Sequence, residues 1–230
     1  MKKVFLSTIF ILMVAIPFTF AQKQISETQA HETILKALIA EKDKGNLPDF
    51  ASVVNLAKQE GTSIGINENT SVGDFQYLVN GTVTSFETYI NYLESNNKIS
   101  AGFKNAIIQL YGDLSADKVA TEQSYTQIIN DYKLSNRYLS SESENVDRYS
   151  KMLIASMSFW KTNEQTKGDE MARGCRCGFF CWLCVGIFDA AGTIAGSPVG
   201  GAIASFVARC CICSCCKGIS NNSSYCNPGN

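Results

Sequence analysis

The sequence contains a single histidine, His31, and has no cysteine before Cys175. A Ser-His-Asp or Cys-His catalytic site would therefore have to be built on His31. Neither a nucleophile-elbow motif nor an HExxH zinc motif is present to support one. We interpret His31 as a solvated histidine on a helix surface, and we expect the protein not to be an enzyme. Hydrolysis by paired carboxylates stays open, because any two acidic residues could meet in space.

Basic residues are also sparse. The 20 lysines and arginines are not interleaved with aromatic residues, so nucleic-acid binding is not indicated. The formal net charge of −1 conceals an uneven distribution, because residues 22–173 hold 15 basic and 20 acidic side chains, whereas residues 174–230 hold 3 and 1. This asymmetry is typical of an acidic body with a basic tail that meets anionic surfaces, and ordinary scatter is the alternative.

The N-terminus has the organisation of a targeting segment. Lys2 and Lys3 precede an apolar run over residues 4–20, and Ala21 is a small residue before a cleavage point. This pattern predicts a secretory signal peptide over residues 1–21, with Gln22 as the mature N-terminus. An uncleaved membrane anchor is the alternative. We therefore expect an exported protein, either extracellular or in the periplasm or cell envelope.

Residues 22–160 have the pattern of an all-α helical bundle. Apolar residues recur at helical spacing, and Ser26, Ser100 and Ser141 stand where helix N-caps are expected. The expected helices cover residues 26–45, 48–61, 75–93, 100–112, 115–139 and 141–160. Asn80-Gly81 in the third is a turn dipeptide typical of β-hairpins. We nevertheless expect one helix there, because the flanking residues do not alternate as hairpin strands would. We expect Leu139 to be buried in the fifth.

A polar linker over residues 161–173 separates this domain from a cysteine-rich tail, residues 174–230. In an exported chain an even number of clustered cysteines predicts a disulfide framework whose pairing the sequence leaves open. Its members are Cys175, Cys177, Cys181, Cys184, Cys210, Cys211, Cys213, Cys215, Cys216 and Cys226. Cys181 and Cys184 with Cys210 and Cys213 form the alternative, a zinc or iron–sulfur site. Otherwise no cofactor is expected.

The tail has a break near its middle, at Ser197-Pro198 and Gly200-Gly201. Proline and paired glycines interrupt helices, so the chain is expected to fold back there as a helical hairpin. Cys184 would then oppose Cys211, and bridges at the open end would close the hairpin. We expect this hairpin to be appended to the bundle.

Small residues line one side of the hairpin. Gly192, Gly196, Gly200, Ala204 and Ala208 repeat every four residues, a spacing that lets two helices approach until their backbones touch. Over residues 189–208 this segment resembles the glycine-zipper segments of small exported bacterial proteins and the apolar bacteriocin-like peptides. The resemblance implies a pore-forming or membrane-perturbing peptide released from a leader.

Three functions are consistent with this organisation. The first is a membrane-interacting tail carried by the acidic domain, which is the function that we expect. The second is a tail that anchors the protein in the envelope or mediates self-association. The third is an exported structural or interaction protein, whose tail packs on the bundle and is held there by disulfides. The sequence specifies neither the target nor a small-molecule ligand.

Overall fold

The protein is all-helical in a computed structural model that describes residues 25–69, 71–116, 122–135, 137–166 and 179–209. The expected signal peptide, with Ala21 and Gln22, lies outside these residues. The described elements are α1 (Glu27–Asp43), α2 (Phe50–Ser63), the 3-10 helix η1 (Val72–Leu78), α3 (Phe86–Ser95), α4 (Ala101–Ala116), α5 (Glu122–Leu134), the short 3-10 helix η2 (Ser140–Glu142), α6 (Ser143–Thr166), α7 (Phe179–Ala195) and α8 (Pro198–Val207).

Several helices begin or end at capping and turn residues that can be recognised in the sequence. Ser26 forms a capping box with Gln29, since each side chain bonds the other residue's backbone N–H. The Ser100 hydroxyl accepts from the N–H of Phe103 at 2.9 Å and so caps α4. After α1, Gly45 has a φ of +78°, a conformation that favours glycine and turns the chain towards α2. These predictions are confirmed.

The expected helix over residues 75–93 is wrong. The Asn80-Gly81 dipeptide turns the chain instead, with Gly81 at a φ of +80° and the Asn80 side chain accepting from the Thr82 N–H. Ser85 then caps a new helix, α3, whose Thr88 side chain bonds back to the Ser85 backbone. Local turn and cap chemistry outweigh the apolar period here.

Four smaller expectations are also corrected. Ser141 lies inside η2 and α6 begins at Ser143, so Ser141 does not occupy the expected N-cap position. Leu139 is 62% exposed rather than buried. Gly112 lies within α4, which continues to Ala116. The expected linker begins inside α6, which runs to Thr166, so residues 161–166 are helical; residues 167–173 lie outside the described part of the chain.

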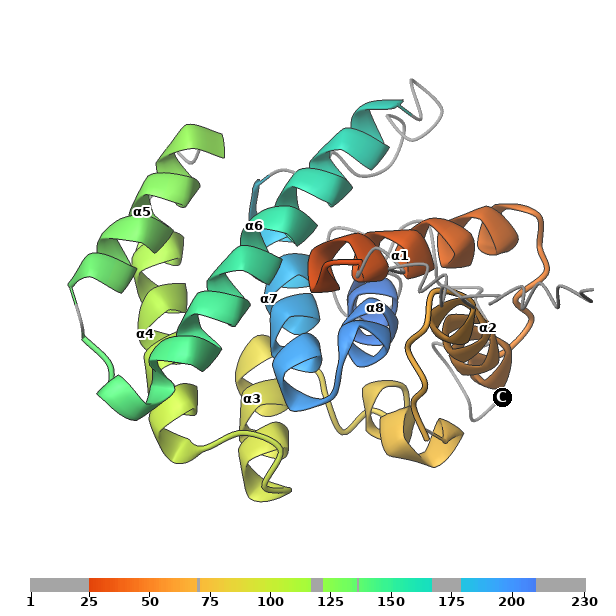
Figure 1. Cartoon of the computed structure of the whole chain (residues 1–230), viewed down its shortest axis with the longest axis horizontal. Coiled ribbons are helices and arrows are strands. Elements are labelled where there is room, and N and C mark those ends of the chain that lie inside the picture. The colour runs from red at the N-terminus through yellow and green to blue at the C-terminus, as the bar shows by residue number, and fades with distance from the viewer. Residues whose placement is uncertain (1–24, 70, 117–121, 136, 167–178, 210–230) are drawn as a thin grey trace, which may run out of the picture.

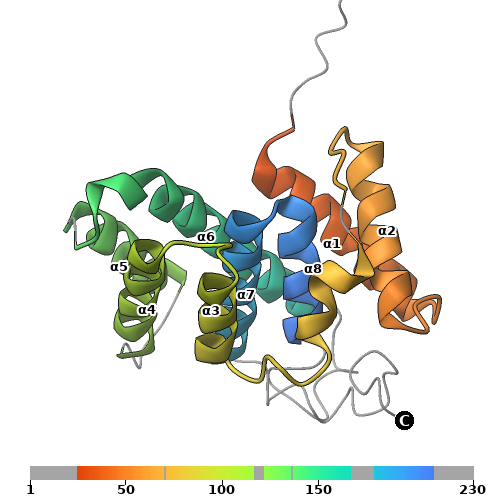
Figure 2. The same cartoon turned by 90° about the horizontal axis from the view of Figure 1, so that it is seen from below.

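The apolar hairpin lies at the centre of the bundle. Residues 179–209 contain α7 and α8, joined at Ser197 and Pro198, where the Ser197 hydroxyl accepts from the N–H groups of Val199 and Gly200. Helix α7 packs on α6 and α3, and α8 packs on α1 and α2. Figures 1 and 2 show the two blue helices between the α3–α6 side of the molecule and the α1–α2 pair. The described part of the tail is thus not appended, because it supplies core to both sides.

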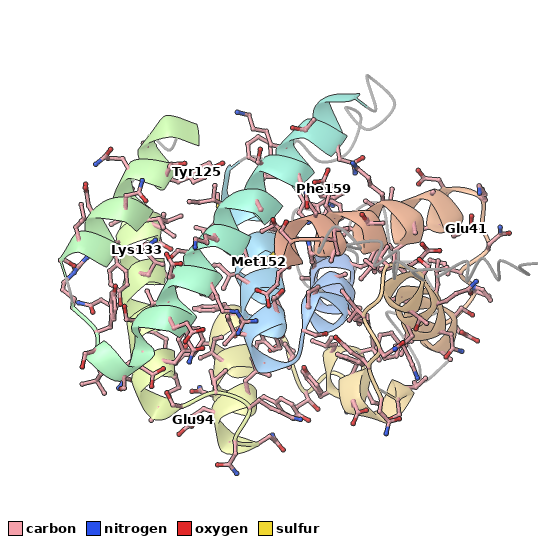
Figure 3. The ribbon with its side chains drawn as sticks, viewed as in Figure 1. Glu41, Glu94, Tyr125, Lys133, Met152 and Phe159 are labelled. Carbon is pink, nitrogen blue, oxygen red and sulfur yellow. The ribbon has the colours of Figure 1, made fainter. Side chains whose placement is uncertain are left out.

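Specific contacts fix the hairpin in this place. The Trp160 indole N–H of α6 donates to the Ser205 hydroxyl of α8 at 2.9 Å, in a buried position. The ring of Phe188 stacks on Tyr89 of α3 with centroids 4.6 Å apart. Charged side chains such as Glu41 and Glu94 lie at the outer edge (Figure 3). None of the described helices combines the length and the apolar character needed to cross a bilayer.

Candidate functional site

A buried pair of ionisable side chains joins the hairpin to the first helix. Nε2 of His31 lies 2.7 Å from Oδ1 of Asp189, and the two side chains are only 2% and 0% exposed. Neither Nε2 of His31 nor the carboxylate oxygens of Asp189 meet the geometric criteria for a hydrogen bond, so this is a close polar contact that becomes an ion pair when the imidazole is protonated. Asp189 is the one acidic or basic residue within α7 and α8.

His31 is buried because of its position on α1, so its assignment as a solvated histidine is wrong. It precedes Ile34, Leu35 and Leu38 by three, four and seven residues, which places all four on one helical face. That face packs on α8. The spacing was visible in the sequence, but nothing in it identified a partner for the imidazole.

Asp189 is enclosed because α8 approaches α7 very closely beside it. A Cβ atom on Gly201 would lie 2.0 Å from the Thr193 hydroxyl oxygen, 3.0 Å from the Asp189 carbonyl oxygen and 3.1 Å from Oδ1 of Asp189. The Thr193 hydroxyl donates to the same carbonyl at 3.0 Å. Only a residue without a side chain fits at position 201.

Two tyrosines complete the surroundings of the pair. Burial raises the pKa of Tyr89 on α3, and the neighbouring Tyr77 and the charge of Asp189 add to this effect. Burial also raises the pKa of Tyr149 on α6, with Asp189 as the next largest cause. Both phenols are therefore neutral at ordinary pH. Only the imidazole of His31 can supply a positive charge to Asp189 among these neighbours.

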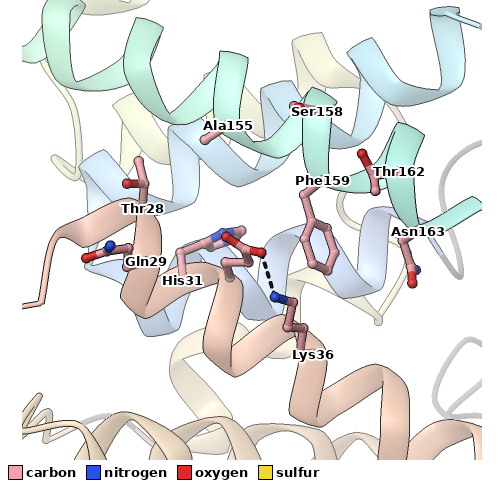
Figure 4. Close-up of a pocket in the computed structure, with 10 residues that line it drawn as sticks. Thr28, Gln29, His31, Lys36, Ala155, Ser158, Phe159, Thr162 and Asn163 are labelled. Carbon is pink, nitrogen blue, oxygen red and sulfur yellow. Dashed lines mark ion pairs between the residues drawn. The ribbon is translucent and has the colours of Figure 1, made fainter.

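A surface hollow of about 450 Å³ lies above His31, between α1 and α6 (Figure 4). Its rim carries the ion pair of Lys36 with Glu32, 2.7 Å long, and the ring of Phe159. The other lining residues are Thr28, Gln29, Ala155, Ser158, Thr162 and Asn163. The hollow thus places His31 between solvent and the buried carboxylate.

The small residues of the expected row differ in how closely they approach the neighbouring helix. A Cβ on Gly192 would lie 3.0 Å from the Cβ of Ala204 and 3.1 Å from the carbonyl oxygen of Gly200, so α7 and α8 meet closely at these three residues. Gly196 is exposed in the turn and faces nothing but its own helix. Ala208 is buried at the end of α8. The closest approach occurs at Gly201, outside the expected row.

The cysteine predictions fall mostly outside the described residues. Cys184 is half-buried on α7, and Cys181 lies in the same helix, but the other eight are not described. The disulfide framework and the alternative metal site, which needs Cys210 and Cys213, therefore stay predictions. Within the described ranges no three His, Cys, Asp or Glu side chains are grouped so that they could hold a metal ion.

The arrangement joins two helices that lie far apart in the sequence. A charged pair with both members enclosed attracts strongly, but it costs free energy as soon as one member loses its charge or its partner. Because His31 belongs to α1 and Asp189 to α7, the pair connects the first helix to the hairpin. Comparisons of the chain with family models, with curated proteins and with solved structures found no match.

Proposed function

We propose that this is an exported protein that acts on membranes by means of the α7–α8 hairpin, which the surrounding helices shield until the bundle opens. One observation supports this proposal above the others. Over their combined length α7 and α8 contain a single acidic or basic residue, Asp189, and every residue of α8 is buried. A helix that is apolar on all sides belongs either in a protein core or in lipid.

The shape of the hairpin suits shallow insertion. At 1.5 Å per residue, α7 would be about 25 Å long and α8 about 15 Å, so a pair lying in the interfacial region is more compatible with these lengths than a span. Close contact at Gly192, Gly200 and Ala204 would keep the two helices together in lipid as it does in the bundle. Arg209, just after α8, would meet anionic headgroups.

The two tryptophans allow a direct test, because Trp182 lies on the hairpin and Trp160 lies on the shielding helix α6. Trp160→Phe leaves Trp182 as the only indole, and Trp182→Phe leaves Trp160. Each full-length variant is mixed with vesicles of phosphatidylcholine and phosphatidylglycerol whose acyl chains are brominated. We expect strong quenching of Trp182 and several-fold weaker quenching of Trp160.

Two controls define the result. Vesicles of phosphatidylcholine alone test the contribution of anionic headgroups, and far-UV circular dichroism tests whether Trp160→Phe, which costs about 1–3 kcal/mol by orphaning Ser205, still folds. Equal quenching of both indoles would mean that the intact bundle adsorbs to the surface. Absence of quenching for both would contradict the proposal.

A second function is favoured by the specificity of the packing. The Trp160–Ser205 hydrogen bond, the Tyr89–Phe188 stack and the His31–Asp189 pair hold the hairpin in one defined position. Such contacts suit an exported structural or interaction protein in which the hairpin is a permanent core and never leaves. This alternative predicts no quenching by brominated lipid under any condition in which the protein stays folded.

A further inference from the structure

We infer that the hollow between α1 and α6 is a binding site for a neutral saccharide of about one or two sugar rings (Figure 4). Its volume of about 450 Å³ falls within the range of roughly 300–1,000 Å³ that is usual for small-molecule sites. The site itself does not depend on the proposed membrane function. Only its effect on the release of the hairpin rests on that function.

The two charged side chains on the rim of the hollow balance each other. Nζ of Lys36 lies 2.7 Å from Oε1 of Glu32, and the two side chains are 66% and 47% exposed. A charged ligand would have to compete both with this pair and with the water around it. An uncharged ligand would leave the pair intact and could still form hydrogen bonds with its ammonium and carboxylate groups. The rim therefore favours a neutral ligand.

Neutral hydrogen-bonding side chains line the walls of the hollow on two helices. They are Thr28 and Gln29 from α1, and Ser158, Thr162 and Asn163 from α6. Oε1 of Gln29 already accepts from the Ser26 N–H in the capping box, so its amide nitrogen is the group left for a ligand. Hydroxyl groups donate and accept hydrogen bonds, and amides do the same through separate atoms. Such walls suit a ligand that carries hydroxyl groups around its edge.

Phe159 supplies an apolar surface in the hollow. Its ring projects from α6 towards α1 (Figure 4) and packs edge to face on Trp160, with ring centroids 5.4 Å apart and an interplanar angle of 85°. This contact fixes the orientation of the Phe159 ring. The C–H groups on one face of a sugar ring can pack on such an aromatic surface, while the hydroxyl groups at its edge reach the walls.

His31 adds an enclosed polar group to the hollow, which it lines although its side chain is only 2% exposed. Nε2 faces Asp189 at 2.7 Å, so Nδ1 is the ring nitrogen left for a ligand. Nδ1 donates a hydrogen bond when it carries a proton and accepts one when it does not. A sugar hydroxyl can be the partner in either case, so its recognition does not depend on the charge of His31.

Occupation of the hollow would stabilise the closed bundle. A ligand there would contact α1 and α6 together, and these helices pack on α8 and α7 respectively. A ligand that binds only this arrangement raises its stability by mass action. Under the proposed function, a bound saccharide would therefore keep the hairpin shielded.

The experiment titrates the full-length protein, without lipid, with glucose, galactose, N-acetylglucosamine and maltose, and follows binding by saturation-transfer difference NMR. We expect at least one of these saccharides to bind at millimolar concentration and to raise the Tm. Thr162→Val replaces an exposed hydroxyl by a methyl group and should weaken binding by about threefold or more. Phe159→Ala removes the apolar surface and should weaken binding by about fivefold or more. Thr62→Val makes the same exchange at an exposed position of α2, outside the hollow, and should bind as the wild type does.

Three results would overturn the inference. The first is failure of all four saccharides to bind. The second is wild-type affinity in the hollow variants, which would place the binding elsewhere; if Phe159→Ala does not fold, Thr162→Val alone decides. The third is tighter binding of glucuronate than of glucose, which would indicate an anion site at Lys36.

The vesicle experiment distinguishes this inference from the proposed function. Saccharide binding without any quenching of Trp182 by brominated lipid would support the site and would contradict the membrane function. Quenching of Trp182 without saccharide binding would do the reverse.

Discussion

Replacing Gly201 by alanine is expected to destabilise the folded protein by about 2–4 kcal/mol, an unusually large effect for one added methyl group. The new Cβ would lie 2.0 Å from the Thr193 hydroxyl oxygen and 3.0 Å from the Asp189 carbonyl oxygen. Rotation of Thr193 would relieve the first clash but would break its hydrogen bond to that carbonyl. The second clash involves backbone, so α8 must move away from α7.

Gly196→Ala is the matched control for this prediction. Gly196 lies in the turn of the same hairpin, has no neighbour beyond its own helix within 4 Å, and its φ is not positive. Because alanine also restricts the unfolded chain, we expect a change within about 1 kcal/mol, of either sign. Urea unfolding followed by circular dichroism measures both variants. Equal losses at the two positions would contradict the close packing of α7 against α8.

Replacing Asp189 by alanine is expected to cost about 3–5 kcal/mol at neutral pH, because it leaves the imidazole of His31 buried without its partner. Glu27→Gln is a suitable control. It removes the charge from the Glu27–Arg148 pair, which is about one-third to one-half exposed and should contribute no more than about 1 kcal/mol.

A double variant shows whether Asp189→Ala destabilises the protein by leaving His31 without its partner or by removing packing at position 189. His31→Leu together with Asp189→Leu removes both charges and fills the space with apolar atoms, and such replacements are commonly neutral or stabilising. We expect the double variant to recover most of the stability lost in Asp189→Ala. A double variant as unstable as Asp189→Ala would show that packing around position 189, and not the unpaired charge, causes the loss.

Helix boundaries set by short-range chemistry could be predicted from the sequence. The cap at Ser26, the stop at Gly45 and the cap at Ser100 depend on residues within four positions of one another. The apolar period is outweighed where a local signal opposes it, as at Asn80-Gly81, whose turn divides residues 75–93 between η1 and α3. Turn chemistry has to be weighed before periodicity at such places.

The candidate site could not be predicted, because its two members lie near opposite ends of the described chain. The spacing of His31 from Leu35 and Leu38 indicated a buried face, which a stricter use of helical periodicity would have recognised. The isolated acid at position 189 likewise indicated a buried charge in need of a partner. Their pairing depends on how α1 crosses the hairpin, which is a property of the tertiary packing.

The spacing of the small residues did not predict which of them lies closest to the neighbouring helix. A spacing of four residues places side chains on one face only within a continuous helix. Because Pro198 begins a new helix after the turn at Gly196, the residues of α8 that face α7 do not continue the row from α7. Gly201 consequently makes the closest approach, although it lies outside the row. Composition is similarly ambiguous about location, because an apolar hairpin suits a protein core as well as lipid.

The described hairpin, α7 and α8, is a core element of the bundle and not an appendage. Thermal unfolding of residues 22–173 alone, compared with the chain from residue 22 to its end, tests this most directly. Without α7 and α8, the faces of α1, α3 and α6 that now pack on them would meet water, so we predict loss of the cooperative transition seen by circular dichroism. A shortened chain that unfolds cooperatively within a few degrees of the full-length protein would contradict the account.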